Sequence, residues 1–519
     1  MKNIKHYAFW PAFILLGGAL ILQFANPDAF FNVFSTASSF FMEKMAWFAI
    51  IVTILCSIVC IWAAFSKFGN VRIGGKDAKP KLKTFSWFSI ALTSSLASGL
   101  LVWGPAEPIY HIQDPASAIT GIEAMSGDAF LFASETMYMH WSFLPYGIMT
   151  TSAITFAFMY YNARRPYSVI SELAPVLHGH EKGKVADIID GVILFCVTVA
   201  IAASLGQMLL NITYGIGFTT GISAGTGVML IITVVIVILA VGTAISGLQK
   251  GIKFLADFNT YGYFVLLAAI LLGGGTFYIL NIGTEGMGSF LNHIFDRSMM
   301  TGAAHDTLWP SWWTTFYWAS YFAWTPTLGM FMGSISYGRK IKDLIFVNVI
   351  GCGGFGAIWC MIISGSSLER QANGIVDLVS ILNEEGIGAV PYKMLESLPL
   401  GFPIAVLYLV ILIISFITCA NANVSVMAGL ASKDVPLDDP TGAPAFQKVI
   451  WGVICSGIAF VVVAAIGIDG VKQLANVSGL LAIFIQVAII ASIVVLIKKW
   501  RAFDETGTYL KEDPADELK

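Results

Sequence analysis

Charged residues are scarce in this sequence. Only 12% of the 519 residues are Asp, Glu, Lys or Arg, whereas a soluble chain usually carries about a quarter. The formal net charge is −3, and neither a basic block nor a zinc-type spacing of Cys and His occurs. These deficits argue against a nucleic-acid-binding protein and against a series of soluble domains.

Cysteine is also rare, and its placement excludes a disulfide framework. All seven cysteines fall inside apolar runs, where they are expected to be small buried side chains. They are Cys56, Cys60, Cys196, Cys352, Cys360, Cys419 and Cys455.

Apolar residues, by contrast, are abundant, at 57% of the chain. They gather in runs of about 20 residues, each long enough to cross a bilayer as a helix. The first run lacks a small-residue cleavage site and is therefore expected to be a retained span. We predict an all-α integral membrane protein with twelve spans, at 7–26, 45–66, 85–110, 130–161, 188–216, 226–249, 259–282, 309–336, 343–366, 401–432, 446–467 and 474–498.

The basic residues predict the orientation of these spans. Only Lys44, Arg297, Arg370, Lys393 and Lys472 fall in the odd-numbered loops, so the positive-inside rule places both termini in the cytoplasm. The expected location is the inner membrane of a bacterium, with multiple passes. Residues 287–300 are expected to lie flat on the outer surface, and the polar tail after Trp500 to be disordered.

Span three carries a small, hydroxyl-rich stretch in mid-membrane. It reads Thr93-Ser-Ser-Leu-Ala-Ser-Gly99. A break here would free backbone N–H and C=O groups for a solute or an ion. The alternative is a close contact between helices built from small residues.

Span eight is predicted to be a second broken helix, interrupted at Pro326. Trp313, Tyr317, Tyr321 and Trp324 recur at helical spacing on one face. Such π surfaces can hold a cation that donates no hydrogen bonds, such as a trimethylammonium group. Aromatic packing between helices remains the alternative, and Trp309, Trp312 and Trp313 fit an interfacial belt.

Spans four and ten contribute further polar positions. Span four contains His140 and Trp141, and a histidine in a span is expected to be a neutral hydrogen-bonding residue. Span ten contains Ile417-Thr-Cys-Ala-Asn-Ala-Asn423. This patch could bind an ion through its oxygens or join helices.

The run from Trp313 to Arg339 resembles the signature of the betaine/choline/carnitine transporter (BCCT) family. Gly104-Pro-Ala-Glu-Pro108, His140-Trp141 and Ser246-Gly-Leu-Gln-Lys-Gly-Ile support this resemblance, which covers essentially the whole chain. It implies a leucine-transporter-type core, a homotrimer and alternating access. The implied segments are two peripheral helices and a basic loop (1–84), a first inverted repeat of five spans (85–282), an outer interfacial helix (283–308), a second five-span repeat (309–500) and a short cytoplasmic tail (501–519).

The resemblance also implies a substrate site. A zwitterionic or cationic solute of the betaine, choline or carnitine type would place its cationic head between Trp141, Tyr321 and Trp324, and its carboxylate near the break in span three. The full set of expected substrate residues is Trp141, Tyr146, Met149, Trp318, Ser320, Tyr321, Trp324, Ser95, Ala97 and Ser98.

Sodium is the coupling ion that the resemblance favours. Its site would fall on Ser94, Ala97, Thr418 and Cys419, although the thiol of Cys419 is a poor sodium ligand. Three alternatives stay open: a sodium-independent exchanger, proton coupling, and a carrier of a zwitterion without a trimethylated head. A transporter-like solute sensor is a more remote alternative.

No nucleophile-base pair or metal cluster indicates an enzyme, and no cofactor is expected. Membrane lipid and the small solute are the expected partners.

Overall fold

The computed structural model describes residues 4–95, 97–177, 183–223, 225–246, 249–433 and 442–509. Leu96 of the predicted break and Gly247-Leu248 of the family motif lie outside these ranges. The described residues fold into helices joined by turns, and within them the only β-type pairings are two isolated bridges.

The helices follow the apolar runs of the sequence. In chain order they are α1 (His6–Ala25), α2 (Pro27–Phe40), α3 (Ala46–Phe65), α4 (Thr84–Ser94), α5 (Ala97–Gln113), α6 (Ser117–Thr120), α7 (Gly127–Trp141), α8 (Phe143–Tyr161), α9 (Val169–Leu177), α10 (Lys184–Thr220), α11 (Thr226–Ile245), α12 (Gln249–Gly273), α13 (Thr276–Asn292), α14 (Ile294–Ser298), α15 (Phe316–Ser334), α16 (Ile341–Ile345), α17 (Gly353–Trp359), α18 (Gly365–Ala372), α19 (Leu378–Glu385), α20 (Val390–Glu396), α21 (Gly401–Leu430), α22 (Ala445–Ile466) and α23 (Ile468–Lys499). Short 3-10 segments are η2 (Lys67–Asn70), η3 (Ala303–His305) and η7 (Trp500–Ala502), and π-helical segments are η1 (Phe41–Met45), η4 (Ser311–Thr315), η5 (Phe346–Cys352) and η6 (Cys360–Ser364).

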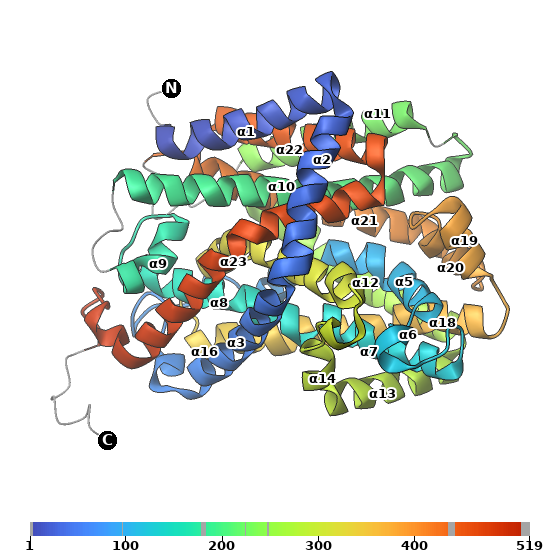
Figure 1. The fold of residues 1–519 in the computed structure, drawn as a ribbon. Helices are drawn as coiled ribbons and strands as arrows, with labels where there is room; N and C mark the ends of the chain where they lie inside the picture. Colours follow the sequence, from blue (N-terminus) through green and yellow to red (C-terminus); the bar gives the residue numbers. More distant parts are fainter. Residues whose placement is uncertain are drawn as a thin grey trace.

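Ten helical stretches of the described chain are long and apolar enough to cross a membrane, and α4 with α5 adds an eleventh as a bent pair. These eleven correspond to predicted spans one to seven and nine to twelve. Helices α1, α10 and α22 run side by side, whereas α2, α3 and α23 cross them obliquely, and α1 begins at the same end of the bundle at which α23 ends (Figure 1). The prediction of a multi-span helical membrane protein is therefore confirmed.

The eighth predicted span, α15, does not reach the hydropathy of the other eleven. Its Trp, Tyr, Thr and Gly residues contribute little to hydropathy, yet almost every one of its side chains is buried. It packs against α8, α10 and α23. Its neighbours are thus protein rather than lipid, which is the setting in which polar and aromatic side chains are tolerated in a span.

The predicted break in span three is present. Helix α4 ends at Ser94, and α5 continues at an angle of 56° to it. The expected second break, at Pro326, is wrong, because α15 runs through this proline without interruption. The hydroxyl of Thr325 donates to the Tyr321 carbonyl at 2.7 Å, whereas the carbonyl that loses its backbone donor at this proline is that of Phe322.

Span four contains a break that the sequence analysis missed. Helix α7 ends at Trp141 and α8 begins at Phe143, with Ser142 between them in a non-helical conformation. Pro145 lies in the first turn of α8, where proline is well tolerated. This proline was the available signal for a new helix start.

Two boundary regions also differ from expectation. Span seven ends at Gly273, and residues 276–282 belong instead to the separate helix α13. The tail was expected to be disordered, but residues 501–509 are ordered. The Tyr509 hydroxyl accepts a hydrogen bond from the Arg72 amide at 2.6 Å, and the Glu505 amide donates to the Asn162 carbonyl at 2.8 Å.

Candidate substrate site

A cavity of about 40 Å³ lies where the broken span meets α15. The lining side chains come from both sides of the break, from the end of α7, from the middle of α10 and from one face of α15. They are Ser95, Gly99, Trp103, Trp141, Ser204, Gln207, Phe316, Tyr317, Ser320, Tyr321 and Trp324. None of these side chains carries a formal charge, so the cavity combines aromatic faces with hydroxyl and amide groups.

The aromatic wall forms a corner. The Trp141 ring stands nearly perpendicular to Tyr317 and Tyr321, with centroids 5.0 and 6.2 Å apart, whereas the two tyrosines are almost parallel at 6.1 Å. Helical spacing explains this arrangement, since residues four apart on α15 share a face. The Tyr321 hydroxyl donates to the His140 carbonyl at 2.9 Å, which fixes α15 to the end of α7.

Gly99 allows Trp141 to take this position. A Cβ at residue 99 would lie 2.6 Å from the Cη2 and Cζ3 atoms of the Trp141 ring, which is closer than carbon atoms can approach without a shift. The small residue beside the break therefore makes room for an aromatic side chain of the cavity.

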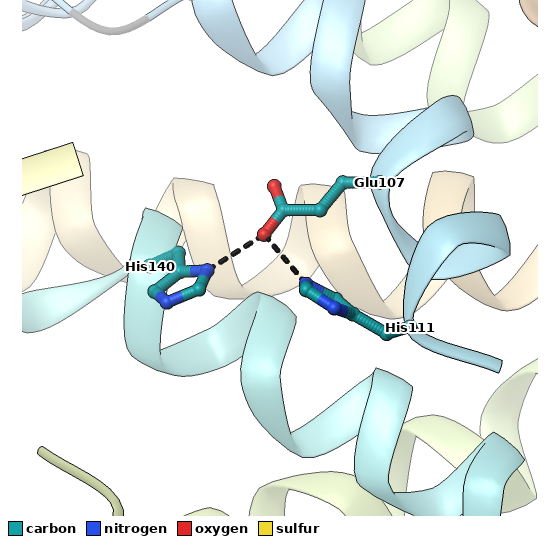
Figure 2. Close-up of side chains that lie close together, drawn as sticks. All are labelled: Glu107, His111 and His140. Carbon is teal, nitrogen blue, oxygen red and sulfur yellow. Dashed lines mark hydrogen bonds and ion pairs between the residues drawn. The ribbon is translucent and has the colours of Figure 1, made fainter. Parts of the chain in front are cut away.

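Behind this corner lies a buried cluster of one carboxylate and two imidazoles. Oε1 of Glu107 is 2.6 Å from Nδ1 of His140 and 3.0 Å from Nε2 of His111, and all three side chains are fully buried. Figure 2 shows both rings directed at this one oxygen. A carboxylate only accepts hydrogen bonds, so both imidazoles present an N–H to it.

The second oxygen of Glu107 supports the cavity wall. Nε1 of Trp141 donates to Oε2 at 2.6 Å, and the Tyr317 hydroxyl donates to the same atom at 2.7 Å. Hydrogen bonds to a charged group are stronger than neutral ones. Glu107 therefore fixes the positions of two cavity rings without lining the cavity itself.

The ligand atoms of Glu107, His111 and His140 lie within 4.8 Å of one another, a spacing that could accommodate a metal ion. The separations of 2.6 and 3.0 Å are those of hydrogen bonds, and Trp141 and Tyr317 occupy the other carboxylate oxygen. The arrangement is that of a hydrogen-bonded cluster. Glu107 and His140 stood out in the sequence motifs, but His111 did not, although an ionisable side chain within a span was a signal for it.

The predicted substrate residues divide into three groups. Ser95, Trp141, Ser320, Tyr321 and Trp324 line the cavity. Three others are fully buried outside the lining set, and two have side chains that the structure does not describe. The buried residues are Tyr146, Met149 and Trp318, and the undescribed side chains are those of Ala97 and Ser98.

Gln207 of α10 lines the cavity and was not predicted from the sequence. Its Oε1 accepts a hydrogen bond from Nε1 of Trp103 at 2.9 Å. Trp103 thereby fixes the side-chain oxygen and leaves the amide nitrogen as the donor end. The available signal was again a polar side chain in the middle of a span.

Helix α4, which ends at the predicted ion residue Ser94, packs against α21, which carries Thr418 and Cys419. Ser94 ends α4 and is buried. Thr418 is also buried, and its hydroxyl donates to the Ile414 and Ser415 carbonyls at 3.0 Å each. Asn423 lies with its amide nitrogen 3.4 Å from the Cys419 sulfur.

Comparisons with known proteins find relatives over nearly the whole length of the chain. The glycine betaine transporter OpuD of Bacillus subtilis is 27% identical over 505 residues, covering 96% of each chain. The ectoine/hydroxyectoine transporter of Virgibacillus pantothenticus is 24% identical over 500 residues, covering 96% of this chain and 97% of its own. A solved Na⁺-coupled sialic acid symporter aligns with 91% of this chain and 88% of its own, at 11% identity and a TM-score of 0.41.

The family model described as BCCT, betaine/carnitine/choline family transporter, matches residues 7–502. The resemblance read from the sequence is thereby confirmed, and a transporter rather than an enzyme is established. The chain belongs to the BCCT family of transporters.

Proposed function

We propose that this protein is a secondary active transporter of a betaine- or ectoine-type compatible solute, working by alternating access. The observation that carries the proposal is the cavity itself, where Trp141, Tyr321 and Trp324 lie together with Ser95 and Gly99 of the broken span. Relatives along the full length of the chain are named for glycine betaine and for ectoine. No covalent chemistry is required.

The cationic head of the solute is assigned to the aromatic corner. A methylated ammonium cannot donate a conventional hydrogen bond, so attraction to π faces is its main specific recognition. Trp141 and Tyr321 meet there almost perpendicularly, and Trp324 lines the same cavity. The corner suits a trimethylammonium group, and it also suits a delocalised ring cation such as that of ectoine.

The carboxylate end is assigned to the side of the cavity with hydrogen-bond donors. The break after α4 beside Ser95 supports this assignment, since an interrupted helix frees backbone groups that can bind a solute. The amide nitrogen of Gln207 is an additional donor, because Trp103 holds the oxygen of that side chain. A small zwitterion would thus place its cationic head at the aromatic rings and its carboxylate at the hydrogen-bond donors.

Sodium is the coupling ion that we propose, at the contact of α4 with α21 near Ser94, Ala97, Thr418 and Cys419. The packing of these helices and the buried Thr418 hydroxyl support the assignment. Exchange without sodium and proton coupling are the competing mechanisms.

The finer architecture is part of the same proposal. We assign two peripheral helices and a five-plus-five inverted repeat, with α15 as the eighth of twelve spans, and a homotrimer in a bacterial inner membrane. Both termini are assigned to the cytoplasm, which the positions of the start of α1 and the end of α23 support (Figure 1).

The first experiment measures uptake of labelled glycine betaine, ectoine, choline and carnitine into proteoliposomes, with and without an inward sodium gradient. Gradient-driven accumulation of glycine betaine or ectoine is the expected result. Uptake only into vesicles preloaded with solute would replace symport by exchange, and uptake of none of the four would contradict the substrate class.

A pair of variants tests the aromatic site. Tyr321→Ala and Trp324→Ala are each expected to reduce glycine betaine uptake by about tenfold or more, since each removes a cation–π contact. Trp312→Ala is the matched control, because Trp312 belongs to the same aromatic run but is 44% exposed and lies outside the cavity lining. Equal losses in all three variants would contradict the assignment. If glycine betaine uptake fell little while ectoine remained the better substrate, a zwitterion without a trimethylated head would be favoured.

A further inference from the structure

Lys472, in the second turn of α23, holds its ammonium group among aromatic rings. Nζ lies 4.3 Å from the ring centroid of Trp313, 5.7 Å from those of Trp103 and Tyr110, and 5.9 Å from that of Phe316. Lys472 lies near the beginning of α23, just before the predicted twelfth span, and a lysine near the end of a span usually has a charged partner or reaches the interface.

Lys472 has no such partner within the described ranges. None of the ion pairs among these residues includes it. The acidic groups that act on it over longer distances are Asp469, one turn earlier on α23, and Glu107. Glu107 is already engaged by four hydrogen-bond donors. The positive charge of Lys472 is therefore held by π faces rather than neutralised by a contact.

Two of the four rings that touch this ammonium also line the cavity. Trp103 and Phe316 meet Nζ of Lys472, and both are cavity-lining residues. Only the thickness of an aromatic side chain thus lies between a positive charge and a cavity whose own lining is uncharged. Lys472 is partly exposed, so solvent weakens its field at the cavity but does not abolish it.

The position of Lys472 determines which end of the proposed solute its positive charge attracts. Trp103, which contacts Lys472, also holds Gln207, the donor assigned to the carboxylate. The rings assigned to the cationic head, Trp141 and Tyr321, are not among those that contact Lys472. A solute carboxylate would therefore be attracted towards Lys472, and a bare cation in the same cavity would gain no such attraction.

We propose that Lys472 is a specificity-determining residue that makes the transporter select zwitterions over plain cations of the same headgroup. The inference rests on the proposed function, and it narrows the substrate class from quaternary-ammonium solutes in general to those that carry a carboxylate. Choline, which has the same trimethylammonium head without the carboxylate, is a poor substrate.

The native protein provides the first test. Uptake of labelled glycine betaine is measured in competition with unlabelled glycine betaine, choline or glycine betaine methyl ester, the last of which has nearly the same shape but no negative charge. We expect glycine betaine to compete at least about tenfold better than the ester or choline. Equal competition by the three would overturn the inference. No uptake of glycine betaine would instead contradict the proposed function.

Two variants then assign the preference to Lys472. Lys472→Met removes the charge and is expected to reduce the preference for glycine betaine over the ester by about tenfold, whereas Lys472→Arg keeps the charge and the preference. A purely structural lysine would predict equal losses for all three solutes, with no change in their ratio, and that outcome would overturn the inference. If Lys472→Met does not yield folded protein, the competition ratio in Lys472→Gln decides in the same way, and the native comparison with the ester stands independently of either variant.

Discussion

The broken span formed by α4 and α5 and the continuous helix α15 build the same cavity in opposite ways. The broken span contributes small residues and freed backbone, at Ser95 and Gly99. Helix α15 contributes large rings from an uninterrupted face. Both contain proline or glycine in mid-membrane, so the presence of such residues does not by itself say which span is broken.

The glycines of the two spans differ in what they contact. Gly99 of α5 faces only the side chain of Trp141, whereas Gly329 and Gly333 of α15 face the backbone of α8 as well as its side chains. The glycine of the broken span thus makes room for a cavity side chain, whereas the glycines of the continuous helix allow two helices to pack closely. The following predictions test this contrast.

The largest effect is expected for Gly329→Ala. A Cβ there would overlap Oγ of Ser152 and lie 2.7 Å from the backbone nitrogen of Ala153. Because a backbone cannot move aside as a side chain can, we expect a loss of about 3 kcal/mol in the free energy of unfolding, seen as a lower thermal midpoint in detergent. Gly457→Ala is the matched control, since a Cβ at that helical glycine meets nothing within 4 Å. Equal midpoints for the two variants would contradict the packing role.

Gly99→Ala is expected to affect transport rather than folding. The added Cβ displaces the Trp141 ring, which is 2.6 Å away, so uptake should fall by about tenfold or more while stability changes by about 1 kcal/mol. Uptake and the thermal midpoint are measured on the same preparation. If the midpoint fell as far as in Gly329→Ala, the two glycines would have the same role and the contrast would fail.

Glu107→Gln tests the group that connects the two spans. The amide keeps one acceptor but places an N–H₂ among groups that are themselves donors, from His111, His140, Trp141 and Tyr317. We expect about a tenfold weaker solute affinity and about 2 kcal/mol lower stability, because buried polar groups lose partners. Tryptophan fluorescence titration measures the affinity. An unchanged affinity would mean that Trp141 and Tyr317 are positioned without the carboxylate.

The smallest effect is expected for Pro326→Ala. Since α15 is already continuous through this residue, restoring the N–H should change stability by less than about 1 kcal/mol and uptake by less than about twofold. Abolished transport with intact folding would show that the proline acts as a functional break, and the contrast between the spans would then disappear.

The sequence predicted most of the fold because lipid imposes strong local rules. Runs of apolar residues mark the spans, and the small residues from Thr93 to Gly99 marked the true break. Pro326 misled the prediction because α15 runs through this proline without interruption, as a span surrounded by other helices can. The break at Ser142 was missed because Pro145 fits the first turn of a helix as readily as it interrupts one.

The site was predicted less completely. Trp141, Tyr321 and Trp324 could be found from their spacing and from the family motif, and they line the cavity. The link between Glu107 and two of the cavity rings could not be found, because the residues that it joins are up to 210 positions apart in the chain. Contacts of this kind depend on how helices pack, which no local pattern encodes.

The buried cysteines have a practical consequence for labelling chemistry. All seven thiols of the native chain are inaccessible, so a membrane-impermeant maleimide should find almost no background target. A single cysteine placed at the exposed position of Lys44 or of Lys79 would then react from one side of the membrane only. The native chain therefore needs no removal of thiols before such single-cysteine labelling.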